Sequence, residues 1–272
     1  MKLETGLPSY DRPPLSEVAL SIQFNALAGF GYVHIGPLWT RFRDKFPDVE
    51  YQPPLQATFE TFGVNPIAPQ LPHLQIMQMP EMPRIWLLAK NEIIQFQRDR
   101  FIHNWRKIGD GDAYPRYEAV RARFLEELSI LQAFANENDL GQLVPNQCEL
   151  TYVNVIKIAD ASDPDPTAKI FKCWNDVGVE IWGPPEDVAL SMRYRILGKD
   201  GEPIGRVSVQ SASGYGADGA RVIQLNLVGR GRPDEPTFEG AVAFLDIARV
   251  KIVEGFTALT TEKMHEAWGR RT

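Results

Sequence analysis

The sequence predicts an α+β protein in which antiparallel, curved sheets pack on long helices. Several runs alternate apolar and polar residues with a period of two, most clearly over residues 15–24 and 188–197, and this pattern predicts half-buried strands. Two longer stretches, residues 115–138 and 238–259, repeat apolar residues at helical spacing. These elements come in the same order in both halves of the chain, so we expect a duplicated β-α-β-β-β-α unit.

This order divides the chain into three parts. We expect an extended N-terminal arm over residues 1–14, a first β-α-β-β-β-α unit over residues 15–145, and a second unit over residues 146–272 that ends in a short tail helix. The arm is predicted to be extended because Pro8 and Pro13 disfavour a helix there.

The first unit opens with a strand, a helix and a second strand. Residues 15–24 predict the first strand, residues 36–46 a short helix, and the alternating residues 55–62 the second strand. The proline-rich residues 63–83 predict a long loop, with residues 74–79 as a candidate edge strand.

A hairpin follows and carries the most polar stretch of the sequence. Residues 85–88 predict one strand, and residues 92–103 predict a second, continuous strand. Alternation along the second strand places Arg98 and Arg100 on the same face as the apolar Ile94, where a charge is costly unless it is paired or solvated. The candidate ligand-binding or partner-binding residues are Gln95, Gln97, Arg98, Arg100, His103, Asn104 and Arg106.

Two interpretations of this polar row remain open. In the structural one, its arginines pair with Asp99, Glu60 or helix carboxylates and pin the sheet to a helix. In the functional one, the row lines a pocket or interface for an anionic or planar ligand. Arg193 and Arg195, on the matching strand of the second unit, would extend the same surface.

The remaining elements complete the two units. Residues 147–158, 188–197, 204–212 and 221–229 predict the strands of the second unit, and Asp200-Gly201 supplies a hairpin turn. The apolar stripe of the first long helix is Tyr117, Val120, Phe124, Leu128, Leu131 and Ala135. The stripe of the second is Phe238, Ala241, Val242, Leu245, Ile252, Phe256 and Leu259.

The repeated order of elements resembles the TATA-box-binding-protein-like fold and the helix-grip folds, in which an antiparallel sheet curves around a long helix. This likeness concerns element order alone, so it implies a fold and no activity.

At the level of sequence, the chain resembles a sporadically distributed family of uncharacterised bacterial proteins. The likeness is carried by residues 13–18, residues 35–39 and, most specifically, residues 95–106, QFQRDRFIHNWR, with residues 256–270 at the other end. It implies a bacterial or phage-borne cytoplasmic protein. The family brings no assigned chemistry, so no catalytic residue is carried over.

Composition and motifs argue against several kinds of binding site. The net charge of −6 disfavours a general binder of phosphate backbones, although a local basic patch would still allow nucleic-acid binding. The four histidines are dispersed and predict no metal site. The glycines of residues 214–219 match G-x-G-x-x-G, but a strand follows them where a dinucleotide site needs a helix, so no cofactor is expected. Cys148 and Cys173 are expected to be buried and structural.

The N-terminal residues lack the apolar core of a signal peptide, and no apolar run approaches the length of a membrane span. We therefore expect a cytoplasmic protein with no membrane association.

The leading hypothesis is a non-enzymatic binding protein that recognises a protein partner, or an anionic or planar ligand, on a curved sheet. The sporadic distribution of the family suggests a place in a bacterial defence or toxin–antitoxin module. One alternative is an enzyme that acts on a phosphorylated or nucleotide substrate through Arg98, Arg100, His103 and Arg106. The other is a nucleic-acid-binding saddle. Whether the protein is an enzyme is left open by the sequence.

Overall fold

The computed structural model gives the arrangement of most of the chain. It describes residues 6–63, 82–109, 111–158, 166–175, 178–183, 185, 187–216 and 218–271. The candidate edge strand at residues 74–79 lies outside the described residues.

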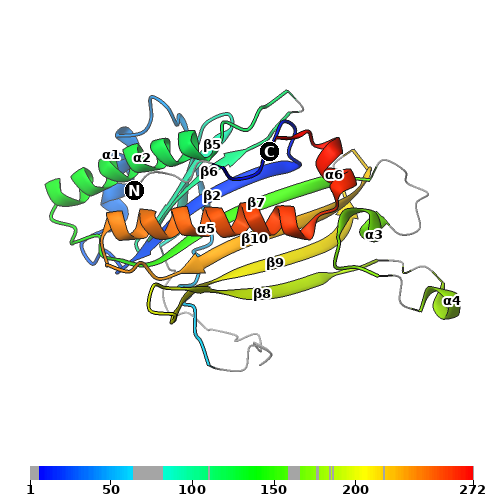
Figure 1. Ribbon diagram of the computed structural model, residues 1–272. Helices are drawn as coiled ribbons and strands as arrows, with labels where there is room; N and C mark the ends of the chain where they lie inside the picture. The colour runs from blue at the N-terminus through cyan, green and yellow to red at the C-terminus, as the bar shows by residue number, and fades with distance from the viewer. Residues whose placement is uncertain are drawn as a thin grey trace.

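Nine strands of the described chain form one antiparallel, curved sheet to which both halves of the sequence contribute (Figure 1). In sheet order these are β3 (Asp48–Gln52), β4 (Arg84–Leu88), β5 (Glu92–Gln97), β6 (Arg100–Arg106), β2 (Leu15–Phe24), β7 (Pro145–Lys157), β10 (Arg221–Gly231), β9 (Pro203–Tyr215) and β8 (Leu190–Leu197). The predicted α+β class with an antiparallel sheet is confirmed.

Two long helices, α2 (Tyr117–Glu137) and α5 (Phe238–Leu259), lie across the same face of the sheet (Figure 1). We call this face the helix face and the opposite one the outer face. The shorter helices are η1 (Tyr32–His34), α1 (Ile35–Thr40), α3 (Pro166–Ile170), α4 (Val179–Trp182) and α6 (Glu262–Ala267). The N-terminal arm pairs with the C-terminal residues. Its strand β1 (Ser9–Tyr10) and the strand β11 (Arg270–Arg271) form a two-stranded antiparallel sheet.

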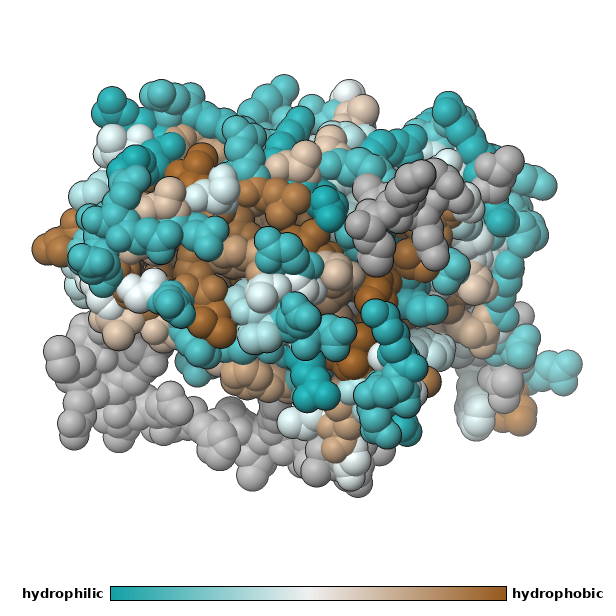
Figure 2. Space-filling view, turned by 60° about the vertical axis from the view of Figure 1, so that its left-hand side comes forward, coloured by the Kyte–Doolittle hydropathy of each residue, from teal (hydrophilic) through white to brown (hydrophobic). Residues whose placement is uncertain are grey.

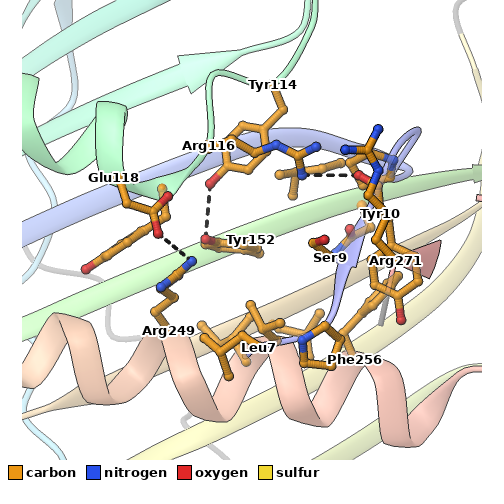
Figure 3. Close-up of a pocket in the computed structure, with 18 residues that line it drawn as sticks. Leu7, Ser9, Tyr10, Tyr114, Arg116, Glu118, Tyr152, Arg249, Phe256 and Arg271 are labelled. Carbon is orange, nitrogen blue, oxygen red and sulfur yellow. Dashed lines mark hydrogen bonds and ion pairs between the residues drawn. The ribbon is translucent and has the colours of Figure 1, made fainter. Parts of the chain in front are cut away.

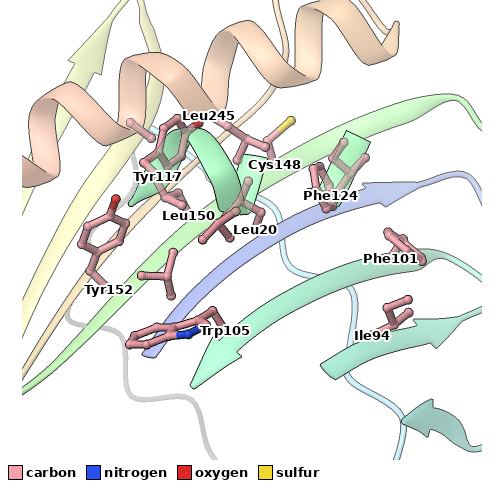
Figure 4. Packing of buried hydrophobic residues seen from close by; sticks show 14 of the residues in the cluster. Leu20, Ile94, Phe101, Trp105, Tyr117, Phe124, Cys148, Leu150, Tyr152 and Leu245 are labelled. Carbon is pink, nitrogen blue, oxygen red and sulfur yellow. The ribbon is translucent and has the colours of Figure 1, made fainter. Parts of the chain in front are cut away.

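The hydrophobic core lies between the helix face and the two long helices (Figure 4). Along β2 the predicted alternation holds, since Val18, Leu20 and Ile22 are fully buried. The predicted stripes also hold. All six stripe residues of α2 are buried, and Leu245 and Ile252 of α5 are fully buried. Each long helix therefore packs as the periodicity of its apolar residues predicts.

The strands are arranged in the same order on either side of the central pair β2–β7. From β2 outward the sheet continues with β6, β5, β4 and β3, and from β7 outward with β10, β9 and β8, so the first half has one strand more than the predicted unit. In each direction the first strand of a half is central, and the later strands follow in reverse chain order.

The second strand of the first unit was predicted at residues 55–62, and this is wrong. The strand is β3, Asp48–Gln52, which pairs with β4, while residues 53–63 are extended but belong to no ladder. Pro53 and Pro54 follow β3 directly and lack the N–H groups that a ladder needs.

The continuous strand predicted at residues 92–103 is also wrong. The chain turns at Arg98-Asp99, so that β5 and β6 form a hairpin with Gln97 opposite Arg100. This turn changes the alternation of faces. Ile94 and Phe96 point to the helix face, whereas Arg100 lies on the outer face beside Gln97.

The two cysteines occupy different environments. Cys148 is buried on the helix face, where burial raises the pKa of its thiol to about 12. Cys173 is exposed, so the prediction that both cysteines are buried is wrong for this residue.

Three glycines bring α5 close to the sheet. Gly205 of β9 lies opposite Gly231 of β10, and the aromatic ring of Phe244 packs on both. A Cβ atom on Gly231 would come within 2.4 Å of the Ile204 carbonyl oxygen and 2.5 Å of the Phe244 ring. One turn further along α5, a Cβ on Gly229 would lie 2.7 Å from the Cβ of Ala248. Helix α5 can lie this close only because these strand positions carry no side chain.

Hydrophilic residues make up most of the border of the face shown in Figure 2, and apolar residues gather toward its middle. Among the helices of the described chain, none combines the length and apolarity that crossing a lipid bilayer requires.

We predict that Gly231→Ala destabilises the protein by about 1–3 kcal/mol, because the added methyl group overpacks the contact with Phe244. Gly255→Ala is the matched control. Gly255 lies in α5, and a Cβ atom there would meet no other atom within 4 Å. Alanine at this position should therefore stabilise the helix by up to about 1 kcal/mol. Urea denaturation midpoints of both variants measure the two changes. Equal effects from the two substitutions would contradict the close approach of α5 to the sheet.

Candidate functional site

The structure does not bring the seven predicted site residues together. Gln95, Gln97, Arg100, Asn104 and Arg106 lie on the outer face of β5 and β6. His103 points to the helix face, and Arg98 lies in the turn between the two strands. The hairpin turn is responsible, because it takes Arg98 off the strand and moves Arg100 from the face of Ile94 to the face of Gln97.

His103 belongs to a buried ionic cluster between the sheet and α2. Its side chain is fully buried, and its Nδ1 lies 2.6 Å from Oε2 of Glu127. The Lys45 Nζ bridges Glu127 at 3.1 Å and Glu92 at 3.4 Å, and Arg123 pairs with Glu92 from the neighbouring turn of α2. Each buried carboxylate therefore has a cationic partner, as burial of a charge requires. For His103, the structure matches the structural interpretation.

Arg98 holds the loop that follows β2. Its Nε donates to the Leu27 carbonyl at 3.2 Å, and its Nη2 donates to the Ala28 carbonyl at 3.4 Å. The expected partner Glu60 pairs with Arg206 instead. Arg98 thus bonds to main-chain oxygens and not to the carboxylates that the sequence suggested.

Gln95 and Asn104 form a separate polar cluster. The Gln95 Nε2 donates to Oδ1 of Asn104 at 2.7 Å, and the Asn104 Nδ2 donates to Oε1 of Glu17 at 2.5 Å. Arg106, at the end of β6, makes no side-chain ion pair with any residue in the described ranges. In the described part of the chain, no side-chain hydrogen bond joins these three residues to the part of the outer face described next.

Four polar residues form a straight row across four neighbouring strands of the outer face. Gln97 of β5 lies opposite Arg100 of β6, Arg100 lies opposite Gln23 of β2, and Gln23 lies opposite Gln147 of β7. We call Gln97, Arg100, Gln23 and Gln147 the glutamine row. The three glutamines are 4–7% exposed, although they lie on the face without long helices.

The glutamine row is covered by residues 53–63, which we call the crossing segment. The Gln97 amide makes two hydrogen bonds to one residue of this segment. Its Oε1 accepts from the Leu55 N–H at 2.9 Å, and its Nε2 donates to the Leu55 carbonyl at 2.9 Å. The Arg100 Nη2 donates to the next carbonyl, that of Gln56, at 3.1 Å.

The contacts continue along the row. The Gln23 Oε1 accepts from the Thr58 N–H at 3.1 Å. The Gln147 amide, in the orientation that satisfies both of its polar atoms, accepts from the Glu60 N–H at 2.9 Å. Each member of the row therefore bonds to the main chain of the crossing segment.

The spacing of these contacts fits an extended chain that runs across the strands. Leu55 contacts β5 and Glu60 contacts β7, and these strands are three places apart in the sheet. Three strand spacings span about 14 Å. Five extended residues span at most about 17 Å, so they cover this distance with little slack.

Beyond the row, the end of the crossing segment meets arginines of the second half. Glu60 pairs with Arg206 of β9 and lies 3.7 Å from Nη1 of Arg230 on β10. The Arg206 guanidinium also stacks over the Phe62 ring at 5.0 Å. Arg206 lies opposite both Arg230 and Arg195, so three arginines are neighbours on adjacent strands. The predicted extension of the polar surface by Arg195 is consistent with this arrangement.

Two carboxylates compensate part of this positive charge. Glu149 of β7 pairs with Arg230, and Glu60 lies between Arg230 and Arg206. Burial lowers the pKa of Arg100, and the charges of Asp99 and Glu149 oppose that shift. The carboxylates thus stabilise arginines that would otherwise repel one another.

The crossing segment buries little of its own surface. Gln56, Thr58 and Phe59 are exposed, Leu55 and Phe62 are half-buried, and the Glu60 side chain, which forms the ion pair with Arg206, is 11% exposed. Hydrogen bonds, ion pairs and one cation–π contact hold it, with little apolar packing. Segments of this kind open locally at low free-energy cost.

Gln23 and Gln147 were missed in the sequence. Each is a polar residue on the polar face of its strand, a pattern that also fits a solvated position. Their alignment with Gln97 depends on the register of three strand pairs, and this register cannot be predicted from the sequence.

No protein-family model matches the chain, and no curated protein sequence matches it. Within the described residues, no group of three histidine, cysteine, aspartate or glutamate side chains is arranged to hold a metal ion.

We predict that Gln97→Ala releases the crossing segment while leaving the fold intact. Loss of about 1 kcal/mol from the paired hydrogen bonds should raise chymotrypsin cleavage at Phe59 about fivefold. The melting temperature should change little, because the segment buries few apolar groups. Gln210→Ala, an exposed glutamine on β9, is the control and should leave the cleavage rate unchanged. An unchanged rate in the Gln97 variant would show that its amide does not hold the segment.

Arg100 and Arg106 should differ in their contribution to stability. Arg100→Ala removes donors to Gln23 and to the Gln56 carbonyl, so we expect a loss of about 1–3 kcal/mol. Arg106→Ala removes no ion pair to a described residue and should stay within about 0.5 kcal/mol of the wild type. Denaturant midpoints of the two variants make the comparison, and a larger loss for Arg106 would contradict the assignment.

Proposed function

We propose that this chain is a non-enzymatic binding protein whose glutamine row recognises an extended segment of a protein partner. The observation that carries the proposal is the contact between the row and the crossing segment. Gln97 bonds to both polar groups of the Leu55 main chain, and Arg100, Gln23 and Gln147 bond to Gln56, Thr58 and Glu60 in turn.

Side-chain amides suit this task because each has a donor and an acceptor at fixed spacing. An amide placed edge-on to an extended chain can therefore satisfy the N–H and the C=O of one residue together, as Gln97 does for Leu55. Such contacts depend on main-chain conformation and little on side chains. They favour an extended ligand of varied sequence over a compact small molecule.

The arginines next to the row supply the sequence preference. In the crossing segment, Glu60 meets Arg206 and Arg230, and two residues later Phe62 stacks on Arg206. A partner segment that repeats these contacts carries an acidic residue followed two positions later by an aromatic one.

In this proposal the crossing segment acts as an intramolecular ligand that a partner replaces. The apolar side chains of Leu55 and Phe62 are only half-buried, which limits the packing energy of the segment, so exchange does not require the core to open. The proposed bacterial family, and a place in a defence or toxin–antitoxin module, are compatible with exchange of one protein segment for another.

We also propose that the sheet arose by duplication of a β-α-β-β-β-α unit, in the manner of TATA-box-binding-protein-like folds. The support is the matching strand order on either side of the β2–β7 pair.

The two alternative functions have less support. The enzyme hypothesis needs Arg98, Arg100, His103 and Arg106 in one cluster, and these side chains lie in a turn, on two faces and at a strand end. A nucleic-acid saddle needs a free basic face, whereas Glu60 and Glu149 already pair with the arginines of β9 and β10.

A peptide-binding experiment tests the proposed function. In one variant, residues 55–62 are replaced by a glycine–serine linker of equal length, which leaves the row vacant. A fluorescent peptide with the sequence of residues 53–63 is then titrated against this variant and followed by anisotropy. We expect saturable binding to the variant and none to the wild type, whose row is occupied.

One peptide variant and one protein variant test which contacts are responsible for binding. A peptide with Glu60→Gln should bind about tenfold more weakly, because it lacks the charge that pairs with Arg206. Gln97→Leu in the linker variant should weaken binding of every peptide. If the linker variant melts cooperatively yet binds no peptide, the proposed recognition of an extended chain is wrong.

A further inference from the structure

A cavity lies on the helix face, on the opposite side of the sheet from the glutamine row (Figure 3). Its walls are the N-terminal arm, the start of α2, the middle of α5 and the strands β7 and β10 beneath. The cavity measures about 380 Å³, within the range of small-molecule sites. The proposed binding of a partner on the outer face makes no use of it.

The arm forms a fixed wall of this cavity. Tyr10 donates to or accepts from Thr257 at 2.9 Å, and its ring packs edge-on against Phe256 at 5.5 Å. Pairing of β1 with β11 and the hydrogen bond from Arg116 Nη1 to the Tyr10 carbonyl at 3.1 Å hold the arm in place. The cavity is therefore bounded on both sides by packed elements of the fold.

One part of the lining is apolar. Leu227 of β10, Ile252, Val253 and Phe256 of α5, and Leu7 of the arm line the cavity, and Leu7 lies close to α5 and Phe256 (Figure 3). Side chains of this kind favour an apolar ligand body of modest size.

The other part is polar and rich in hydrogen-bond donors. The hydroxyl groups of Tyr114 and Tyr152 lie 3.2 Å apart. Only one of their two hydrogens is used in the bond between them, so the other can be donated to a ligand. Burial raises the pKa of both phenols, that of Tyr152 to about 12, so both stay protonated at neutral pH.

Two arginines stand beside this tyrosine pair. Arg249 lines the cavity, pairs with Glu118 at 2.7 Å and stacks over the Tyr117 ring at 4.9 Å. Among the described residues, the Arg116 side chain has no carboxylate partner, and it donates to the Tyr10 carbonyl.

The main chain at the start of α2 adds hydrogen-bond donors at the end of the cavity where Arg116 lies. Arg116, Tyr117 and Glu118 line it, so the first turn of α2 borders the cavity, and no side chain caps that helix. The free N–H groups of an uncapped first turn attract negative charge. Arg116 itself has φ 72° and ψ 154°, a conformation that only glycine adopts readily. The guanidinium at this strained position lines the cavity and donates to the Tyr10 carbonyl of the arm.

We propose that this cavity binds a small carboxylate with an apolar tail. The carboxylate lies among Arg116, Arg249 and the Tyr114–Tyr152 pair, and the tail extends along Leu227, Ile252 and Phe256. A monoanion fits best, because Glu118 pairs with Arg249 and Asp11 with Arg271, so that among the described residues of the lining Arg116 carries the charge left without a carboxylate.

Titration of the full-length protein with three ligands of equal tail length tests this proposal. Decanoate, decanol and decylamine share the tail and differ in the head group. By calorimetry, we expect decanoate to bind at least about tenfold more tightly than decanol, and decylamine to bind least. Because both phenols stay protonated, decanoate affinity should be the same at about pH 7 and about pH 9.

Two cavity variants and a control locate the head group. Arg116→Gly suits the backbone at this position, so its melting temperature should match the wild type while decanoate affinity falls about tenfold. Tyr152→Phe should lower decanoate affinity while leaving decanol unchanged. Arg41→Met, which breaks an exposed ion pair with Glu137 away from the cavity, should change neither affinity.

Equal affinities of the wild type for decanoate and decanol would overturn the anionic head group. Absence of binding by all three ligands would overturn the cavity as a site for tailed ligands. A loss of decanoate affinity in Arg41→Met equal to that in Arg116→Gly would show a general charge effect and would also overturn the proposal.

Discussion

The pairing of β2 with β7 is the constraint on which the rest of the structure depends. This ladder joins the two halves into one sheet and aligns both of its faces. On the helix face it sets Val18 opposite Tyr152, which lines the cavity, and on the outer face it sets Gln23 opposite Gln147. A shift of one residue would move every side chain of a strand to the other face, so the core, the glutamine row and the cavity depend on the same register.

Much of the scaffold could be predicted from the sequence, because its apolar residues repeat with the period of the element that buries them. β2 occupies the predicted residues 15–24, and α5 occupies the predicted residues 238–259. The stripe of α2 is likewise buried as its spacing indicates. In these elements local periodicity and tertiary burial agree, and prediction from sequence is reliable where they do.

The candidate site could be predicted only in part. Gln97 and Arg100 do contact the crossing segment, but the Arg98-Asp99 turn shifts the alternation that was used to align them. Residues 55–62 alternate like a strand, yet their main-chain groups bond to side-chain amides on another part of the sheet. Periodicity reports which side of a segment is buried, and it cannot distinguish a ladder from a row of glutamines as the hydrogen-bond partner.

The crossing segment belongs to the same polypeptide as the row that holds it, so the tether and not the solution sets its local concentration. β3 ends at Gln52, directly before this segment, and a short connection of this kind gives an effective concentration on the order of millimolar. A free chain with identical contacts at micromolar concentration would compete at a disadvantage of about a thousandfold. Any partner that occupies the row must therefore make additional contacts beyond it, or reach the protein already concentrated beside it.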